Sequence, residues 1–461
     1  MKNFRFESDS IGQIEVDINS YWGAQTQRSI ENFSIGQEKM PISLIKALII
    51  IKICAARINK ESNILDKKIA DAILDAGNFL LHDRNIKDKF PLSVWQTGSG
   101  TQSNMNVNEV ISCICNERLE GNKNCKTPVH PNDHVNKSQS SNDSFPTAMN
   151  IAIVQETQSK LMPALENLKK ILYDKSEEWK DIIKIGRTHM QDATPITFGQ
   201  EFSGYYFQIH SSIKRIKKSL EELHFLPQGG TAVGTGLNAP KDFDKKIVKA
   251  IAEFTKLEFQ TSKNKFEALA TNDSIVEFAG SINGLAVSLM KIANDIRLLS
   301  SGPRCGLNEI ILPSNEPGSS IMPGKVNPTQ CEALSMVCAQ VMGSYHSIVI
   351  GGSNGHLELN VFRPLVIYNI LSSINILSDS IMNFAQKAIA GMKINHDQIE
   401  IYKARSLMQV TALNPYIGYD KSAQIAKKAF AENLSLKEAA VKLDLLSEKE
   451  FEQYINLQKM V

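Results

Sequence analysis

The sequence predicts a mainly α fold, with a long central helical bundle between smaller N-terminal and C-terminal domains. Three observations support this prediction. Apolar residues recur at helical spacing over several long segments, strand-like alternation is confined to the first forty residues, and a tail rich in Lys and Glu begins near residue 391. We expect a mixed, mostly helical domain at residues 1–139, the bundle at 140–395 and a small helical domain at 396–461.

At the N-terminal end, alternating residues around Phe4, Ile11 and Val16 indicate a short, irregular β element. Helical periodicity then begins at about Ile42. Further along, the polar segment Thr97–Thr101 leads into another helical pattern.

The central region contains periodic apolar stretches long enough to form the helices of a bundle. In the first of these stretches, Pro163 is the expected position of a kink. The predicted long helices run from Phe145 to about Lys184, from Ile196 to Leu223, from Ser274 to Ser301, from Thr329 to Ile350 and from Leu357 to Ala390. Because such helices stay apolar on more than one face, we expect them to pack against further copies in a homo-oligomer.

Composition narrows the class of partner. Lys+Arg 51 against Asp+Glu 49 gives a net charge of +2, which does not indicate binding to nucleic acid or to a membrane surface. We therefore expect a small-molecule ligand. The first residues are charged, and apolar runs such as Ala47–Ile53 are interrupted by Lys52, which favours a cytoplasmic protein. The seven cysteines are odd in number and suit reduced, buried thiols.

The most informative polar segment is the loop from Gly318 to Pro328. It contains Ser319, Ser320, Lys325 and Asn327 between residues that either free or fix the backbone, so it can close over a ligand. Pro328 suits the first turn of the following helix, which would place Lys325 and Asn327 at a helix N-terminus. Free N–H groups and the helix dipole favour an anion there.

Three other segments rich in Ser, Thr, Asn or His also precede helical patterns: Thr97–Thr101, Ser138–Asp143 and Gly186–His189. Each alone could be a simple helix cap. Brought together by a bundle, several helix N-termini with hydroxyl groups would form a pocket suited to two carboxylates.

His189 is the side chain best matched to proton transfer near neutral pH. A structural, hydrogen-bonded histidine is the alternative. Glu332, in the first turn after the Gly318–Pro328 loop, is the candidate partner that would fix the imidazole tautomer, although an acidic residue also suits that position without a catalytic role.

Two other motifs give weaker indications of function. His130 and His134 lie four residues apart, but Pro131, Asn132 and Asp133 favour a turn, so anion binding or turn structure is preferred over a metal site. The glycine-rich segment Gly229–Gly236 lacks the Lys-Ser/Thr ending of a phosphate loop and indicates a tight turn near the pocket.

The loop Gly318–Pro328 resembles the signature of the fumarase/aspartase superfamily. Further segments are similar to class II fumarate hydratases in particular: His130–Asp133, Lys137–Asp143, Gly186–Pro195, Asn264–Ala270 and Thr329–Ala333. The likeness extends over nearly the whole chain, from Trp22–Gln27 to Gly418–Lys421.

This resemblance implies reversible hydration of fumarate to L-malate in the tricarboxylic acid cycle, without a metal or organic cofactor. It also implies a homotetramer whose sites each draw on three subunits. Ser319 would take the C3 proton of malate, and His189, supported by Glu332, would handle the proton of the water. Lys325 and Asn327 would hold a carboxylate. The remaining substrate-binding positions implied are Ser99, Gly100, Thr101, Ser140, Ser141, Asn142, Thr188, Ser320 and Val326.

His130, Pro131, Asn132 and Asp133 match a second, non-catalytic dicarboxylate site. Relatives often carry an arginine just before this turn, where the present chain has Lys126-Thr127-Pro128. This departure leaves the charge at the second site open.

Two alternatives remain at the level of sequence. An aspartase would use the same fold and loop to eliminate ammonia from aspartate, and spacing alone does not identify the leaving group. A non-catalytic helical protein is disfavoured because a structural bundle needs none of Ser319, His189, Lys325 and Glu332.

Overall fold

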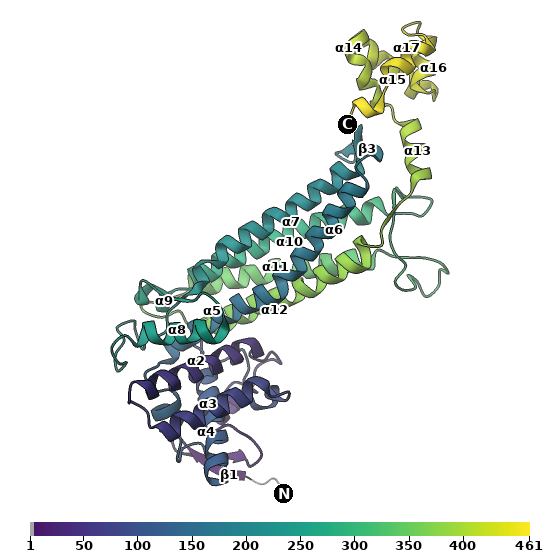
Figure 1. The fold of residues 1–461 in the computed structure, drawn as a ribbon. Helices are drawn as coiled ribbons and strands as arrows, with labels where there is room; N and C mark the ends of the chain where they lie inside the picture. The colour runs from purple at the N-terminus through teal and green to yellow at the C-terminus, as the bar shows by residue number, and fades with distance from the viewer. Residues whose placement is uncertain (1–3) are drawn as a thin grey trace. The chain divides into compact units, whose positions relative to one another are not determined.

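The computed structural model describes residues 4–461 and is mainly α-helical, which confirms the predicted fold class (Figure 1). The predicted β element is a hairpin in which β1 (Phe4–Ser8) pairs antiparallel with β2 (Gln13–Asp17). The other strands described are short: β3 (Ile183–Thr188), β4 (Gln191–Thr197), β5 (Phe225–Leu226), β6 (Gln260–Thr261), β7 (Ile310–Ile311) and β8 (Lys393–Ile394).

The chain forms two compact units, each made of segments that are distant in sequence. The first holds the chain as far as Met162, together with Lys214–Ala286 and Ala339–Leu377. The second holds Pro163–Ile213, Val287–Cys338 and Ser378–Val461. The three-domain division at 1–139, 140–395 and 396–461 stays a prediction.

In the first unit, α2 (Ile42–Glu61) is the central helix. It contacts α3 (Lys67–His82), α4 (Thr101–Glu120), α5 (Ser141–Glu156) and α8 (Phe243–Thr255). Because neighbours cover it on several faces, α2 is apolar nearly all round. α1 (Ala24–Asn32) contacts α4 and also β2 of the N-terminal hairpin.

The first long helix is interrupted and ends earlier than predicted. It consists of α5, a π-helical turn at Thr157–Leu161 and α6 (Met162–Glu178). The π turn ends two residues before Pro163, which has no N–H to donate, so the predicted irregularity is confirmed. The predicted end at Lys184 is wrong, because residues 183–188 form β3, paired with β4.

The remaining long helices are α7 (Phe198–Leu220), α10 (Asp273–Leu299), α11 (Thr329–Ser353) and α12 (Arg363–Phe384), which run alongside one another (Figure 1). The Tyr205 hydroxyl on α7 donates to Asp295 on α10 at 3.0 Å. α12 begins six residues later than predicted. Leu357 has a left-handed backbone with φ 51°, and Pro364 suits the first turn of a helix that begins at Arg363.

Three of these helical segments are long and apolar enough to cross a membrane, judged by length and composition alone: Asp273–Leu299, Thr329–Ser353 and Arg363–Ile389. That these segments are so long and apolar was not predicted from the sequence, where Ala47–Ile53 was taken as representative of the longest apolar runs. In the most apolar window of α11, only 28% of residues are buried inside the chain. This helix therefore carries apolar surface that a single chain leaves uncovered.

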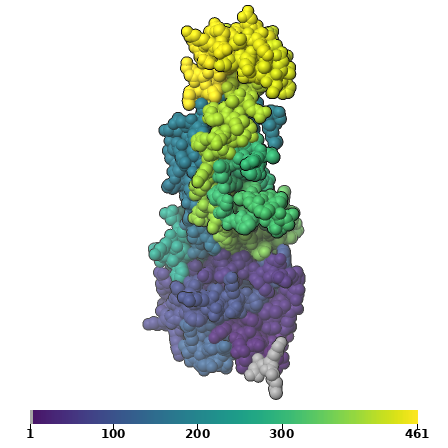
Figure 2. Space-filling view, turned by 90° about the vertical axis from the view of Figure 1, so that its right-hand side faces the viewer, coloured from purple at the N-terminus to yellow at the C-terminus, as the bar shows by residue number. Residues whose placement is uncertain are grey.

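The C-terminal helices of the second unit form a cluster with its own core, shown in yellow in Figure 2. Its elements are the 3-10 turn Met408–Leu413, α14 (Asn414–Ile417), α15 (Tyr419–Glu432), α16 (Leu436–Lys442) and α17 (Glu448–Tyr454). α13 (His396–Arg405) precedes this cluster in the chain. Leu413, Ile425 and Ala439 are fully buried in this core.

Candidate active site

The predicted site residues fall into two groups, one in each unit. The first unit holds Ser99, Gly100, Thr101, His130, Pro131, Asn132, Asp133, Ser140, Ser141 and Asn142. The second unit holds Thr188, His189, Ser319, Ser320, Lys325, Val326, Asn327 and Glu332. We describe each group by itself.

Ser140–Asn142 form the beginning of α5. Ser140 is the N-cap residue, and its hydroxyl oxygen accepts a hydrogen bond from the Asn142 backbone N–H at 3.2 Å. The Asp143 carboxylate in turn accepts from the Ser140 backbone N–H at 3.0 Å, which completes a capping box. The Ser141 hydroxyl accepts from the Asn104 side-chain amide on α4 at 3.1 Å. The predicted polar segment therefore begins a helix, as expected.

Ser99, Gly100 and Thr101 form the beginning of α4. The Ser99 and Thr101 hydroxyls lie 2.8 Å apart and share a hydrogen bond. Gly100 has a left-handed backbone with φ 77°, and a Cβ placed there would lie 2.2 Å from the ring of Phe145 on α5. Glycine therefore lets the starts of α4 and α5 approach each other.

A buried network of charged and polar groups supports these two helix starts. Asp143 is fully buried, and its second carboxylate oxygen accepts from the backbone N–H groups of Gly229 and Thr231 at 2.9 and 3.0 Å. The predicted glycine-rich turn thus encloses the carboxylate of Asp143. Arg363, also fully buried, donates from one guanidinium nitrogen to the Asn142 carbonyl at 2.9 Å and from another to the Leu269 carbonyl.

Lys52 is the third buried charged residue of this region. Its ammonium group donates to the side-chain oxygens of Asn136 and Gln139 at 2.9 and 3.0 Å. Burial lowers the pKa of Lys52 to about 7, and the charge of Asp143 partly offsets that effect. Burial raises the pKa of Asp143 to about 6, against the backbone N–H groups that favour its charged form. Burial also lowers the pKa of Arg363 to about 10.

Lys52 and Arg363 were not predicted from the sequence to belong to the site. Each stands inside an otherwise apolar segment, which is the signal that could have revealed them. A charge in such a segment must find a buried partner.

His130 begins a π-helical turn at Pro131–Val135, so the predicted turn is confirmed. The Nδ1 atom of His130 accepts from the backbone N–H groups of Asn132 and Asp133, both at 3.2 Å. Burial lowers the pKa of His130, although Asp133 opposes the shift. Because Nδ1 already accepts hydrogen bonds, it carries no proton there, and we treat the imidazole as neutral. The Asp133 carboxylate, 3.3 Å from Nδ1, therefore forms no ion pair with His130.

A small cavity lies beside this turn. It is lined by His130, Pro131, Asn132 and Lys126, among other residues. The Lys126 ammonium group donates to the Ser8 hydroxyl at 3.0 Å. Lys126 therefore supplies one cation at this cavity, whose lining also contains Glu7, Asp9 and Glu109, so the charge at the predicted second site stays open.

In the second unit, His189 lies at the tip of a hairpin that the sequence analysis did not predict. β3 and β4 are joined by His189 and Met190, whose φ angles are 55° and 59°. Two left-handed residues match a tight hairpin turn, yet neither is glycine or asparagine, so the turn carries backbone strain. Thr188, His189 and Met190 are all exposed, and the alternation of Ile183 and Ile185 was the signal for a strand.

Ion pairs at the base of the hairpin hold it in place. The Glu309 carboxylate is almost wholly buried and lies 2.8 Å from the Lys184 ammonium group and 2.6 Å from the Arg187 guanidinium group. Lys184 also pairs with Glu201 on α7 at 2.9 Å. The exposed tip is therefore built on a firmly fixed base.

The Gly318–Pro328 loop is closed by internal hydrogen bonds. The Gly318 N–H donates to the Lys325 carbonyl at 2.8 Å, and the Asn327 side-chain amide donates to the Gly318 carbonyl at 2.5 Å. The Ser319 hydroxyl oxygen accepts from the backbone N–H groups of Ile321 and Met322 at 3.2 and 3.1 Å. Two N–H donors at this oxygen would favour its deprotonated form.

α11 begins at Thr329, directly after the loop, which confirms the predicted start of this helix. The Pro328 carbonyl accepts from the Cys331 and Glu332 N–H groups at 3.0 and 3.1 Å, which places Pro328 just before the helix instead of inside its first turn. Lys325 and Glu332 are exposed. Within residues 4–461, no hydrogen bond joins Glu332 to His189, so their proposed pairing stays a prediction.

One group of side chains has the geometry of a metal site. The ligand atoms of Glu7, Cys113 and Cys125 lie within 4.8 Å of one another. The Arg5 guanidinium group already contacts this group, at 2.8 Å from Glu7 and 3.6 Å from the Cys113 sulfur. We therefore interpret the cluster as a buried contact of the N-terminal hairpin.

Comparisons with known proteins define the class of this helical bundle. The sequence model of the Lyase family matches residues 12–343, and that of the fumarase C C-terminus matches residues 410–461. A solved structure, class II fumarase from Schistosoma mansoni, is 44% identical with a TM-score of 0.97, and the alignment covers 99% of each chain. A fumarate lyase:delta crystallin from Brucella melitensis, bound to cobalt, is 36% identical with a TM-score of 0.94.

Curated relatives make the assignment more specific. The chain is 60% identical to fumarate hydratase class II from Rickettsia conorii over 461 residues, which cover 100% of this chain and 99% of the relative. It is 56% identical to mitochondrial fumarate hydratase from Dictyostelium discoideum, covering 100% of this chain and 95% of the relative. The chain belongs to the class II fumarate hydratase family of the fumarase/aspartase superfamily.

Proposed function

We propose that this protein catalyses the reversible hydration of fumarate to L-malate in the tricarboxylic acid cycle. The observation that supports it most is the full-length identity of 60% to a relative named fumarate hydratase class II. The residues that the resemblance implies for the catalytic pocket are all present in this chain, although the segment Lys126–Pro128 lacks the arginine that relatives often carry at the second site. The site is suited to a small dicarboxylate, because helix starts and a lysine supply hydrogen-bond donors and positive charge.

Ser319 takes the C3 proton of malate, and Lys325 and Asn327 hold a substrate carboxylate. Removing a proton next to a carboxylate builds a dianionic aci-carboxylate. Donors that are fixed in advance stabilise this species more than they stabilise the substrate. The two N–H groups that donate to the Ser319 oxygen support its role as base. His189, with Glu332, moves the proton of the water.

The substrate is oriented by the hydroxyls and backbone of the two helix starts and by the neighbouring positions on the hairpin and loop. These are Ser99, Gly100, Thr101, Ser140, Ser141, Asn142, Thr188, Ser320 and Val326. Lys126 and the turn at His130–Asp133 form a second dicarboxylate site outside the catalytic pocket.

We also propose a cytoplasmic homotetramer in which three subunits contribute to each site. The uncovered apolar surface of α11 supports subunit contacts along the long helices. The exposed positions of His189, Lys325 and Glu332 support sites completed by other copies. Light scattering of the purified protein would give the subunit number, and a monomer with full activity would contradict the shared site.

A coupled assay with malate and with aspartate tests the reaction. We expect turnover of malate and none of aspartate, and turnover of aspartate alone would identify an ammonia-lyase instead. Ser319→Ala and His189→Asn should each lower kcat by about 10²–10⁴-fold with the oligomer intact. Unchanged rates in both variants would refute the assigned roles.

A further inference from the structure

Asn104 on α4 is a buried amide that contacts Ser141, one of the candidate substrate-binding residues. Its side-chain nitrogen donates to the Ser141 hydroxyl oxygen and to the Asn136 side-chain oxygen, each at 3.1 Å. Its side-chain oxygen has no hydrogen-bond partner among the described residues 4–461. A buried acceptor left unpaired costs stability, so the neighbours of Asn104 must determine which way this amide points.

The direction of the Asn104 amide is fixed by hydrogen bonds that begin at the backbone. The Gln139 side-chain amide donates to two backbone carbonyls, both at 3.1 Å, which turns its oxygen toward the Lys52 ammonium group. The Asn136 side-chain amide donates to the Gln139 carbonyl at 3.2 Å, so its oxygen also accepts from Lys52. Asn136 therefore presents an oxygen to Asn104, and only the amide nitrogen of Asn104 can face it.

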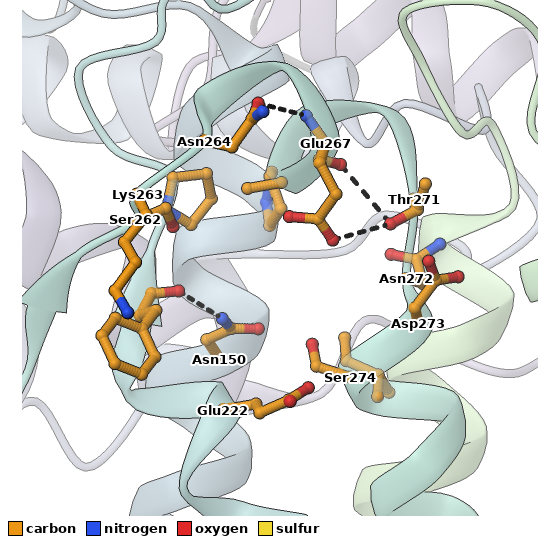
Figure 3. Close-up of a pocket in the computed structure, with 15 residues that line it drawn as sticks. Asn150, Glu222, Ser262, Lys263, Asn264, Glu267, Thr271, Asn272, Asp273 and Ser274 are labelled. Carbon is orange, nitrogen blue, oxygen red and sulfur yellow. Dashed lines mark hydrogen bonds between the residues drawn. The ribbon is translucent and has the colours of Figure 1, made fainter.

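This direction determines what the Ser141 hydroxyl can do. Because its oxygen accepts from Asn104, its single proton points elsewhere, and no acceptor for that proton is present within residues 4–461. Asn150, further along α5, differs in this respect. In the pocket that α5 and α9 (Lys265–Ala270) line, its side-chain amide donates to the Phe225 carbonyl at 3.2 Å (Figure 3). The Ser141 proton is thus left for a ligand.

We propose that Asn104 is a positioning residue, which commits the Ser141 hydroxyl to donate to a carboxylate oxygen of the bound dicarboxylate. Asn104 acts through Ser141 and does not touch the substrate. A donor that is aimed in advance needs no reorientation when the ligand arrives. Since the ligand is the dicarboxylate of the proposed function, the inference rests on that function.

Succinate, a dicarboxylate that cannot be hydrated, is the probe for calorimetric titration of the full chain. In Asn104→Asp, a carboxylate would accept the Ser141 proton and withdraw it from the ligand, so succinate should bind about tenfold more weakly. In Asn104→Leu, the side chain neither donates nor accepts. The hydroxyl is then free to rotate, and we expect binding about threefold weaker. Unchanged affinity in both variants would overturn the proposal.

Asn108 provides a matched control on the same helix. It lies one turn beyond Asn104, is equally buried and also donates to the Asn136 side-chain oxygen, at 3.2 Å. Within residues 4–461, no hydrogen bond joins it to Ser141. Asn108→Asp and Asn108→Leu introduce the same groups beside Asn136 and should change the affinity for succinate by less than about twofold. Equal losses at positions 104 and 108 would assign the effect to the buried network and not to Ser141.

A double-mutant cycle tests whether Asn104 acts through Ser141. In a Ser141→Ala background there is no hydroxyl to direct, so adding Asn104→Leu should leave the affinity for succinate unchanged. A further threefold loss of about the size seen with Ser141 present would show a purely structural role and refute the positioning. The cycle uses only neutral substitutions, so it decides the matter even if Asn104→Asp does not fold.

Turnover of malate by the unmodified protein separates this inference from the proposed function. If the protein turns over malate and binds succinate while the cycle is additive, only the role of Asn104 is refuted. If it neither turns over malate nor binds succinate, the proposed function fails, and the direction of Ser141 toward a dicarboxylate fails with it.

Discussion

The two halves of the candidate site differ in how firmly their polar groups are held. In the first unit, Asp143 and Arg363 are fully buried and bonded to the backbone on which Ser140–Asn142 depend. In the second unit, His189 and Lys325 are exposed, one at a hairpin tip and the other in a glycine-containing loop.

This difference teaches which part of the site is preorganised within a single chain. The helix starts of α4 and α5 have their donors fixed before any substrate arrives, which is the arrangement that electrostatic catalysis requires. His189 at the hairpin tip and Lys325 in the loop are instead exposed. Substitutions in the first half should therefore cost stability, whereas those in the second half should cost activity alone.

The largest expected effect on stability comes from Asp143→Asn. An amide would turn its own N–H₂ group toward the N–H donors of Gly229 and Thr231 and would leave the charge of Arg363 without its buried counterpart. We expect a loss of about 3–5 kcal/mol in the free energy of unfolding. Urea unfolding at fixed protein concentration measures it, with the exposed Asp192→Asn as control. A loss below about 1 kcal/mol would contradict a preorganised half-site.

In the second half, Lys325→Met should separate activity from stability. We expect kcat/KM for malate to fall by about 10²–10³-fold, because a charge that stabilises the aci-carboxylate is lost. The free energy of unfolding should change by less than about 0.5 kcal/mol, because Lys325 is exposed. Lys387→Met, an exposed lysine of the same unit, serves as control for activity. A comparable loss of stability in Lys325→Met would show that the loop belongs to the fixed framework.

The fold could be predicted where helical periodicity was long and uninterrupted. α11 was located to within a few residues at its C-terminal end, because its apolar spacing continues to Ile350. The hairpin of β3 and β4 was missed because its turn uses His189 and Met190, which no propensity associates with two left-handed residues. Glu309 forms ion pairs with Lys184 and Arg187 at the base of this hairpin, and such tertiary contacts cannot be recognised in a local sequence pattern.

The candidate site was predictable as a set of motifs and not as a network. Polar segments that can be recognised from the sequence alone contain Ser319, Lys325 and His189. Lys52 and Arg363 lie far from those segments in the sequence. The packing of α2 and α12 against the start of α5 brings them into the buried network there. Sequence also placed Asp143 at a helix start without indicating its burial.

The pH dependence of stability offers a smaller test of the buried half. The pKa of Lys52 is about 7 in the folded protein against a usual value of 10.5, so between these values the unfolded chain holds more protons. Stability should therefore rise with pH above 7, by at most about 1.4 kcal/mol per pH unit from this group. Lys52→Met should lack this rise. If the free energy of unfolding changed equally with pH in both proteins between pH 7 and 9, Lys52 would not be desolvated in the folded state.

The smallest expected effect concerns the loop. Gly324 has φ 80°, and nothing lies within 4 Å of a Cβ placed there, so Gly324→Ala would add backbone strain and no clash. We expect this strain to destabilise the closed conformation of the loop by about 1 kcal/mol, which lowers kcat/KM by about fivefold. Gly324→Asn should recover most of this loss, because asparagine tolerates left-handed angles.

At Gly100, by contrast, the ring of Phe145 stands 2.2 Å from the added atom, so any side chain should displace α5 as well. If Gly324→Ala and Gly324→Asn lowered kcat/KM equally, backbone strain would not be the cause, and the loop would need glycine for close approach to another subunit.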